Sequence, residues 1–391
     1  AGSGTNQVRI DPSNDLASGT SYYIQIGSTA FDDLVGNSYS GITDTTSISF
    51  TTEDVVKPTL RASSPADNAT AVSVDSSIVL TFSEVVDIES GNILVKRQTD
   101  DVIVEEIDIV SSMLTGTGTS TITINPSRDF SSSTEYYIEI SATAFDDPSG
   151  NSYAGINDKT TLNFVSADVI APAPPASLNL IIASDTGSSN ADNITSDATP
   201  TITGRAEAGS SISLYGSDGR TVVGMATADG NGEWTINAAE LADGNHQLTA
   251  TATDAAGNTS SASAGLSITI DTSSAKPAEL DLEPGSDSGS AKSDDVTVNL
   301  KPTITGTAEA GSNVSLYDTD GTTLVGTSTT SDNGTWRITT SELNVGVHLI
   351  TSKAIDTAGN TSAASTVLSI TIDIATAAPT GLDLATSSDG G

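Results

Sequence analysis

The sequence repeats one short pattern, Asp-x-x-Gly-Asn, whose side chains could bind a hard cation. Its copies span residues 33–37, 147–151, 254–258 and 356–360. Each copy offers a carboxylate and an amide oxygen, and its glycine allows a sharp bend of the backbone. Calcium takes about 6–8 oxygen ligands from carboxylates, carbonyls and water. The pattern therefore predicts calcium-binding turns, and the ligands expected from them are Asp146, Asp147, Asp254, Asn258, Asp356 and Asn360.

Two further sets of aspartates recur in step with this pattern. An alternating apolar and polar stretch follows each copy and ends in an aspartate, namely Asp54, Asp168, Asp271 and Asp373. A second acidic cluster opens two later repeats, as Asp185 with Asp192 and as Asp287 with Asp294. These residues could ligate the same kind of cation. Alternatively, they are solvated turn residues whose carboxylates bond to their own backbone.

Internal repeats organise the chain of 391 residues into about four related units. Residues 1–54 align without a gap on the C-terminal half of a complete long repeat, residues 55–168. Two short repeats follow a proline-rich linker, at 169–271 and 272–373, and residues 374–391 match the start of a further one. Because half a sandwich would expose sheet edges, we expect the sequence to be a window from a longer protein.

Alternation of apolar and polar residues predicts strands in both repeat types. In the long repeat the segments are 78–82, 93–95, 102–109, 122–124, 136–140 and 162–164. In the first short repeat they are 177–182, 200–206, 211–215, 221–228, 233–237, 246–253 and 265–271. Such a series of short strands is typical of an immunoglobulin-like sandwich. The sequence therefore predicts an all-β fold, with tandem immunoglobulin-like sandwiches in an extended rod.

The same alternation assigns side chains to the cores. Tyr136, Ile138 and Ile140 share the inward face of one strand, while Tyr137 points the other way. Trp234 and Trp336 occupy matching positions in short strands, where core packing is favoured over a sugar-binding platform.

The topology of a sandwich should bring aspartates of neighbouring repeats together. The loop between the last two strands lies at the end where the chain enters, whereas the last strand leaves at the opposite end. We therefore expect Asp54 to meet Asp146 or Asp147, Asp168 to meet Asp254, and Asp271 to meet Asp356. Such carboxylates repel one another unless a cation joins them. The second acidic cluster should lie nearer the exit end, where it could share Asp271.

Composition argues against several functional classes. Lys and Arg number 14 against 50 Asp and Glu, for a formal net charge of −36, so the surface repels nucleic acid and anionic membranes. The absence of cysteine excludes disulfides, thiolate metal sites and a cysteine nucleophile. No apolar run approaches the roughly 20 residues of a membrane span. Catalysis needs a unique pocket, whereas each candidate residue recurs in a sister repeat, so we expect no enzyme.

The recurring motifs resemble those of bacterial surface proteins. The short repeat, with Thr-Ile-Thr-Gly at 201–204, Gly-Glu-Trp at 232–234 and the Asp-x-x-Gly-Asn turn, resembles the bacterial Ig-like repeats of giant secreted adhesins of the repeats-in-toxin type. The long repeat, with Thr-Phe-Ser-Glu at 81–84 and a Tyr-Tyr pair at 136–137, is similar to the bacterial Ig-like domain of S-layer proteins. The resemblance implies a calcium-rigidified stalk on the outside of a bacterial cell, holding a distal adhesive tip away from the surface. The glycine-rich calcium nonapeptides of that adhesin type are absent from this sequence.

Two functions from different classes stay open. The first is a non-catalytic extender of a large adhesin, with calcium as its cofactor, neighbouring repeats as its partners and the adhesive target bound by domains outside the sequence. The alternative is a module that binds glycan or ice, for which the outward row Thr249, Thr251 and Thr253 could provide a surface. Asp318 and Asp320 suggest another calcium loop, but a hairpin turn accounts for them better because the sister repeat has glycine at the first position. His246 and His348 are expected as strand residues in separate repeats.

Overall fold

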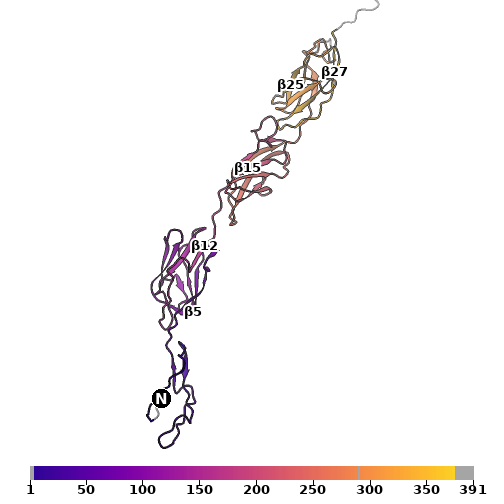
Figure 1. Ribbon diagram of the computed structural model, residues 1–391. Coiled ribbons are helices and arrows are strands. Elements are labelled where there is room, and N and C mark those ends of the chain that lie inside the picture. Colours follow the sequence, from indigo (N-terminus) through magenta and orange to yellow (C-terminus); the bar gives the residue numbers. More distant parts are fainter. Residues whose placement is uncertain (1–3, 289–290, 375–391) are drawn as a thin grey trace, which may run out of the picture. The chain divides into compact units, whose positions relative to one another are not determined.

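The computed structural model describes residues 4–288 and 291–374 (Figure 1). The chain divides into two compact units, Ala1–Ile170 and Ala171–Gly391. Every regular element of the described residues is a β-strand, which confirms the predicted all-β class. These residues contain no helix long and apolar enough to cross a membrane. The expected further repeat at 374–391 lies outside the described residues, apart from Ile374.

The complete long repeat is a sandwich of two sheets around one core. One sheet has the strand order β4-β12-β10-β6-β7, and the other has β11-β5-β9-β8 with β3 paired to β5. The strands are β3 (Leu60–Ser64), β4 (Ala69–Val72), β5 (Ile78–Ile88), β6 (Asn92–Arg97), β7 (Ile103–Asp108), β8 (Leu114–Thr115), β9 (Thr119–Ile124), β10 (Glu135–Ile140), β11 (Phe145–Asp146) and β12 (Asn163–Ser166). Tyr136, Ile138 and Ile140 are buried in the core, as predicted. Tyr137 lies on the other face of β10 but is also buried, because Lys96 and Lys159 cover its ring at 5.5 and 5.6 Å from the centroid.

The N-terminal part of the first unit forms a two-stranded sheet. Strands β1 (Ser21–Tyr23) and β2 (Ser49–Thr51) pair antiparallel. Tyr22 stacks on Phe50 with ring centroids 5.9 Å apart, as Tyr136 and Phe164 do at 5.8 Å in the complete repeat. Phe50 is nevertheless 43% exposed, whereas Phe164 is 1% exposed.

Each short repeat is a sandwich of one three-stranded and one five-stranded sheet. The strand orders are β13-β15-β18 with β14-β20-β19-β16-β17, and β21-β23-β26 with β22-β28-β27-β24-β25. In the first short repeat the strands are β13 (Ala176–Leu180), β14 (Ile194–Thr195), β15 (Thr201–Arg205), β16 (Ser211–Tyr215), β17 (Val222–Thr227), β18 (Glu233–Asn237), β19 (Gly244–Thr253) and β20 (Leu266–Ile270). In the second they are β21 (Ala278–Leu282), β22 (Val296–Thr297), β23 (Thr303–Thr307), β24 (Asn313–Tyr317), β25 (Leu324–Thr329), β26 (Thr335–Thr339), β27 (Gly346–Ile355) and β28 (Leu368–Ile372). The seven strands predicted for the first short repeat are all present; the two-residue β14 was not predicted.

The tryptophans lie in the short-repeat cores, as predicted. Trp234 and Trp336 are each 3% exposed, so neither ring offers a platform to a sugar. Each ring lies against a glycine on the neighbouring strand, since Gly204 pairs with Trp234 and Gly306 pairs with Trp336. A Cβ on either glycine would lie 2.3 Å from the ring Cζ2.

Candidate metal sites

The Asp-x-x-Gly-Asn turn is built by its own aspartate. Asp147 Oδ1 accepts hydrogen bonds from the backbone N–H groups of Ser149 and Asn151, each at 2.8 Å. Asn151 Nδ2 donates to Asp147 Oδ2 at 2.8 Å, and Gly150 supplies the positive φ of 87° that the turn requires. The same contacts between aspartate and asparagine recur at Asp33, Asp254 and Asp356. The aspartate therefore forms the turn whether or not it also binds a cation.

These hydrogen bonds lower the pKa values of Asp147 and Asp254. Burial acts to raise the pKa of Asp147, but the bonds from Asn151, Ser149 and Gly150 outweigh it and leave the pKa below its usual value. At Asp254 the side-chain bond from Asn258 is the main cause of a lowered pKa. An ionised carboxylate oxygen has more than one lone pair, so it can accept an N–H and still ligate a metal.

The first unit brings three carboxylates together where residues 1–54 meet the complete long repeat. Oxygens of Asp54, Glu84 and Asp147 all lie within 4.8 Å of one another. Asn151 Nδ2 also donates to the backbone oxygen of Asp54 at 3.0 Å, which ties the turn to the preceding segment. Burial, and then the charges of Asp147 and Asp54, raises the pKa of Glu84. Oxygens on opposite sides of a calcium ion lie about 5 Å apart, so this group fits calcium.

The second unit repeats the arrangement between its two short repeats. Asn360 Nδ2 donates to the backbone oxygen of Asp271 at 2.7 Å and to Asp356 Oδ2 at 2.9 Å. Burial, and then the charges of Asp271 and Asp356, raises the pKa of Glu309. The charges of Asp271 and Asp356 thus act on Glu309 at this junction, but among the described residues only the first-unit group has its carboxylate oxygens within 4.8 Å of one another. Asp356 is 3% exposed, so its charge is largely removed from water.

The glutamates of both groups were not among the predicted ligands. Glu84 lies on β5, and Glu309 lies in the loop between β23 and β24. The sequence contains a usable signal, since Ala-Glu-Ala-Gly-Ser occurs at both 206–210 and 308–312. Glu84 likewise belongs to the Thr-Phe-Ser-Glu motif of the long repeat.

The remaining predicted junction residues are described within their own units. Asp168 Oδ1 in the first unit accepts hydrogen bonds from Ser132 Oγ at 2.8 Å and from the Ile170 N–H at 3.1 Å. Asp254 belongs to the second unit, so its expected meeting with Asp168 stays an expectation. Asp146 lies on β11 next to the first carboxylate group, and its Oδ1 is buried without a hydrogen-bond partner in the described residues. The Asp373 N–H donates to Thr297 O at 2.9 Å.

The second acidic cluster lies beside the end of the last strand of each short repeat. Strand β14 pairs in parallel with β20, and the Asp271 N–H donates to Thr195 O at 2.9 Å. Asp185 is 5% exposed and Asp287 is 1% exposed, and the Oδ1 atom of each has no hydrogen-bond partner in residues 4–288 and 291–374. The carboxylates of Asp192 and Asp294 accept only local hydrogen bonds, from the Ile194 and Val296 N–H groups. A buried carboxylate oxygen without a donor suits a cation better than a solvated turn does.

The cluster is more acidic in the second short repeat than was predicted. Burial, and then the charges of Asp281, Asp287 and Asp294, raises the pKa of Asp295. In the first short repeat burial is again the main cause of the raised pKa of Asp185, with Asp192 adding to it. Asn179 and Asn193 occupy the positions of Asp281 and Asp295 there. Both short repeats thus gather aspartates at this loop, and the second gathers more of them.

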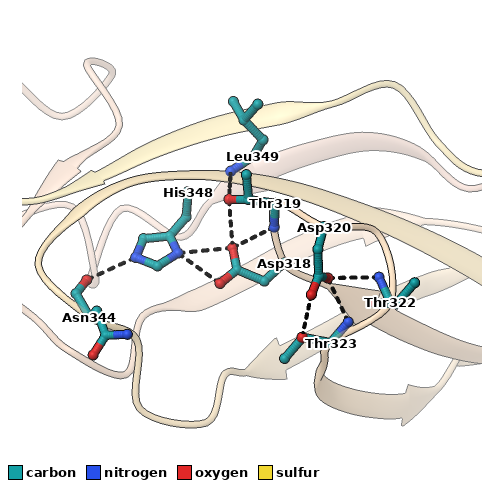
Figure 2. A network of polar contacts seen from close by, with 8 residues as sticks. All are labelled: Asp318, Thr319, Asp320, Thr322, Thr323, Asn344, His348 and Leu349. Atoms are coloured by element: carbon teal, nitrogen blue, oxygen red, sulfur yellow. Dashed lines mark hydrogen bonds and ion pairs between the residues drawn. The ribbon is translucent and has the colours of Figure 1, made fainter.

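The residues of the expected hairpin turn are shown in Figure 2. Asp318 accepts hydrogen bonds from His348 Nδ1 at 2.9 Å and from the Thr319 N–H at 2.7 Å. Asp320 accepts from the Thr322 and Thr323 N–H groups, so both carboxylates are engaged within the chain. The Gly321 N–H donates to Asp318 O at 2.7 Å, which confirms the hairpin turn. His348 lies on β27 and is bonded to its own repeat, and His246 is the corresponding residue of β19.

Models of two bacterial Ig-like domains match this chain. One matches residues 1–52 and 54–166, and the other matches residues 172–272 and 274–374. The chain belongs to the bacterial Ig-like domain family. Its described repeats are bacterial Ig-like domains in tandem, which confirms the resemblance and the fold class inferred from the sequence. Among curated proteins, none matches this sequence.

Several solved structures share the fold at low sequence identity. The tetra-tandem repeat in the extending region of a large adhesion protein is 18% identical, covering 78% of this chain and 73% of that chain with a TM-score of 0.26. A structure from a 1.5-MDa bacterial ice-binding adhesin is 19% identical, covering 80% of this chain and 96% of that one with a TM-score of 0.33. The FN1–FN3 domains of chicken CNTN1 are 12% identical, with 78% and 99% coverage and a TM-score of 0.29.

Proposed function

We propose that this chain is a non-catalytic extender of a large bacterial surface adhesin, stiffened by calcium where its Ig-like repeats meet. One observation carries the proposal: oxygens of Asp54, Glu84 and Asp147, contributed by adjoining repeats, lie within 4.8 Å of one another at the junction of the first unit. An Asn from the Asp-x-x-Gly-Asn turn bonds the preceding backbone at this junction and at the one between the short repeats. This asparagine contact, together with two aspartate charges that act on one glutamate, recurs at junctions in two repeat types and supports a role in joining repeats.

The physical argument is one of charge. Three carboxylates at one junction repel one another, and a divalent cation replaces that repulsion with attraction to both repeats. Asp54, Glu84 and Asp147 would hold the ion in the first unit, and Asp271, Glu309 and Asp356 would do so in the second. Asp168 and Asp254 are proposed ligands of the same kind, each within its own unit, and the Asn258 and Asn360 amide oxygens are additional proposed ligands. Asp373 would provide the same carboxylate at the next junction.

The second acidic cluster adds a further proposed calcium site in each short repeat. Asp185 and Asp192 would hold an ion in the first, and Asp287 and Asp294 would hold one in the second. Asp295 and Asp281 would join the second site, because their charges act on one another and on Asp287. The buried Oδ1 atoms of Asp185 and Asp287 support this assignment.

The setting we propose is the outside of a bacterial cell. Extracellular calcium modules bind at about 10⁻⁴ to 10⁻³ M, so those junctions that depend on calcium would loosen at cytoplasmic calcium levels and stiffen after export. The partners of this segment would be neighbouring repeats of the same chain, and domains outside it would bind the adhesive target. The net charge of −36 supports the absence of contacts with nucleic acid or anionic membranes.

Small-angle X-ray scattering on residues 1–391 tests the proposal. We expect the maximum dimension to be sharply defined in about 10 mM calcium, which is well above the expected dissociation constant, and to shorten and blur in chelator. The Glu309→Gln variant should blur relative to the parent in calcium, because it removes a ligand, and should blur no more than the parent in chelator, because it removes one repelling charge. Glu342→Gln is the matched control, since Glu342 is 66% exposed and pairs only loosely with Lys301. Identical scattering with calcium and with chelator would remove calcium from the proposal.

A further inference from the structure

The two short repeats contact each other through a second surface whose hydrogen bonds between the repeats involve no carboxylate. In the first repeat it is the loop of residues 184–188, which follows β13. In the second repeat it is the backbone of the Asp-x-x-Gly-Asn turn at 356–360. Both segments belong to the same compact unit. We call this pair of segments the glycine contact.

Hydrogen bonds across the glycine contact join uncharged groups. Thr186 Oγ1 donates to Ala358 O at 2.8 Å, and the Ser188 N–H donates to Thr357 O at 3.2 Å. Both acceptors are backbone carbonyls of the turn, which its internal hydrogen bonds leave available. Ala358 is 0% exposed, so the contact excludes water around these bonds.

Two glycines allow the backbones to approach this closely. Gly187 has a φ of 99°, and a Cβ there would lie 2.0 Å from Thr357 O. Gly359, with a φ of 94°, faces it: its Cβ would lie 3.0 Å from Gly187 Cα. A side chain at position 187 would therefore both strain its own backbone and push the turn away.

The loop of residues 184–188 is held in place by hydrogen bonds within its own repeat. Thr186 Oγ1 accepts a hydrogen bond from the Ser196 N–H at 2.8 Å, and Thr195 Oγ1 donates to Ser184 O. Thr195 is 0% exposed. The loop is therefore held in position before it meets the next repeat, which lowers the entropic cost of the contact.

We propose that the glycine contact is a self-recognition surface that orients one short repeat on the next without a cation. The loop at 184–188 fits the turn of a following short repeat because it donates hydrogen bonds to two carbonyls of that turn and packs against one glycine of that turn. The sequence at 287–289, Asp-Ser-Gly, matches Asp-Thr-Gly at 185–187, so the second short repeat carries the same recognition sequence for a further neighbour. This inference does not depend on calcium binding. At this junction the glycine contact sets the orientation of one short repeat on the next, and the carboxylates respond to calcium.

The test measures a distance between the short repeats in excess chelator. Because the natural chain has no cysteine, spin labels can be placed uniquely through Met225→Cys and Lys353→Cys. Met225 is 64% exposed on β17, and Lys353 is exposed on β27. Double electron–electron resonance on the full chain then gives the distribution of distances between the labels.

We expect one narrow distribution in chelator for the labelled parent. Gly187→Ala should at least double its width, and Thr186→Val should widen it to a lesser extent, because it removes one donor and leaves the backbone free to approach. Gly230→Ala is the control, since Gly230 lies in an exposed turn of the same repeat and a Cβ at that position would have nothing within 4 Å. Emission of the buried Trp234 confirms that each variant keeps the fold of its repeat.

A broad distribution for the parent in chelator would overturn the proposal, and so would equal widths for the parent and both contact variants. Neither result depends on whether calcium binds. If calcium has no effect on any distribution but the parent is narrow and Gly187→Ala is broad, the glycine contact stands and the calcium proposal falls.

Discussion

Replacing Glu84 by Gln should change the stability of the long repeat in opposite directions with and without calcium. The substitution keeps the size of the side chain and removes one of three charges whose oxygens lie within 4.8 Å of one another. Without calcium it relieves repulsion with Asp54 and Asp147. With calcium it removes a ligand. The unfolding temperature should therefore rise in chelator and fall in calcium.

The magnitudes follow from the distance and the expected affinity. Two unit charges 4.8 Å apart repel by about 3 kcal/mol at an effective dielectric constant of about 20. Salt lowers this value, because Asp54 and Glu84 are half-exposed. Calcium at about 100 times its dissociation constant stabilises by about 2.7 kcal/mol. At about 4 °C per kcal/mol for a domain of this size, losing the calcium term lowers the unfolding temperature by roughly 10 °C.

Differential scanning calorimetry on residues 1–391 can resolve this effect. Both tryptophans, Trp234 and Trp336, lie in the short repeats, so a transition that is silent in tryptophan fluorescence belongs to the first unit. Glu89→Gln is the matched control, because Glu89 follows the same strand and is exposed. Equal shifts of Glu84→Gln in calcium and in chelator would refute the reasoning, as would a result no different from that of Glu89→Gln.

Two further predictions concern the second short repeat, and a Trp234→Phe background lets Trp336 report on it alone. Burial is the main cause of the raised pKa values of Asp295 and Glu309. The contribution of these two carboxyl groups to the free energy of unfolding is therefore complete below the usual carboxyl pKa. It is lost as the pH rises through the raised values. In chelator, the unfolding temperature should therefore be higher at about pH 5 than at about pH 7, and calcium should abolish this difference. A higher unfolding temperature at about pH 7 in chelator would contradict the raised pKa values of Asp295 and Glu309. Separately, Gly306→Ala places a Cβ 2.3 Å from the Trp336 ring and should cost about 1–3 kcal/mol through overpacking. Gly285→Ala, with nothing within 4 Å, should leave the transition unchanged, and an equal loss in both variants would place the cause outside the Trp336 contact.

Sequence alone was sufficient for the longer core strands and for their inward side chains, but it did not predict β3, β4, β8, β11 or β14. The alternation that places Tyr136, Ile138 and Ile140 on one face is a local property of an extended backbone, so it survives without knowledge of the partner sheet. Gapless repetition then carried the assignment from one repeat to the next.

Only the tertiary structure showed which carboxylates gather. The approach of Asp54 to Asp147 could be anticipated, since both follow from the ends of strands in a sandwich. Glu84 and Glu309 could not be placed in this way, because they come from other strands and loops whose distance from the junction depends on how the sheets pack. The glycine contact likewise joins residues far apart in the chain, Thr186 and Ala358. Strand periodicity depends on neighbouring residues and can be recognised in the sequence. A site between repeats depends on backbones that approach one another only after each sandwich has folded around its core.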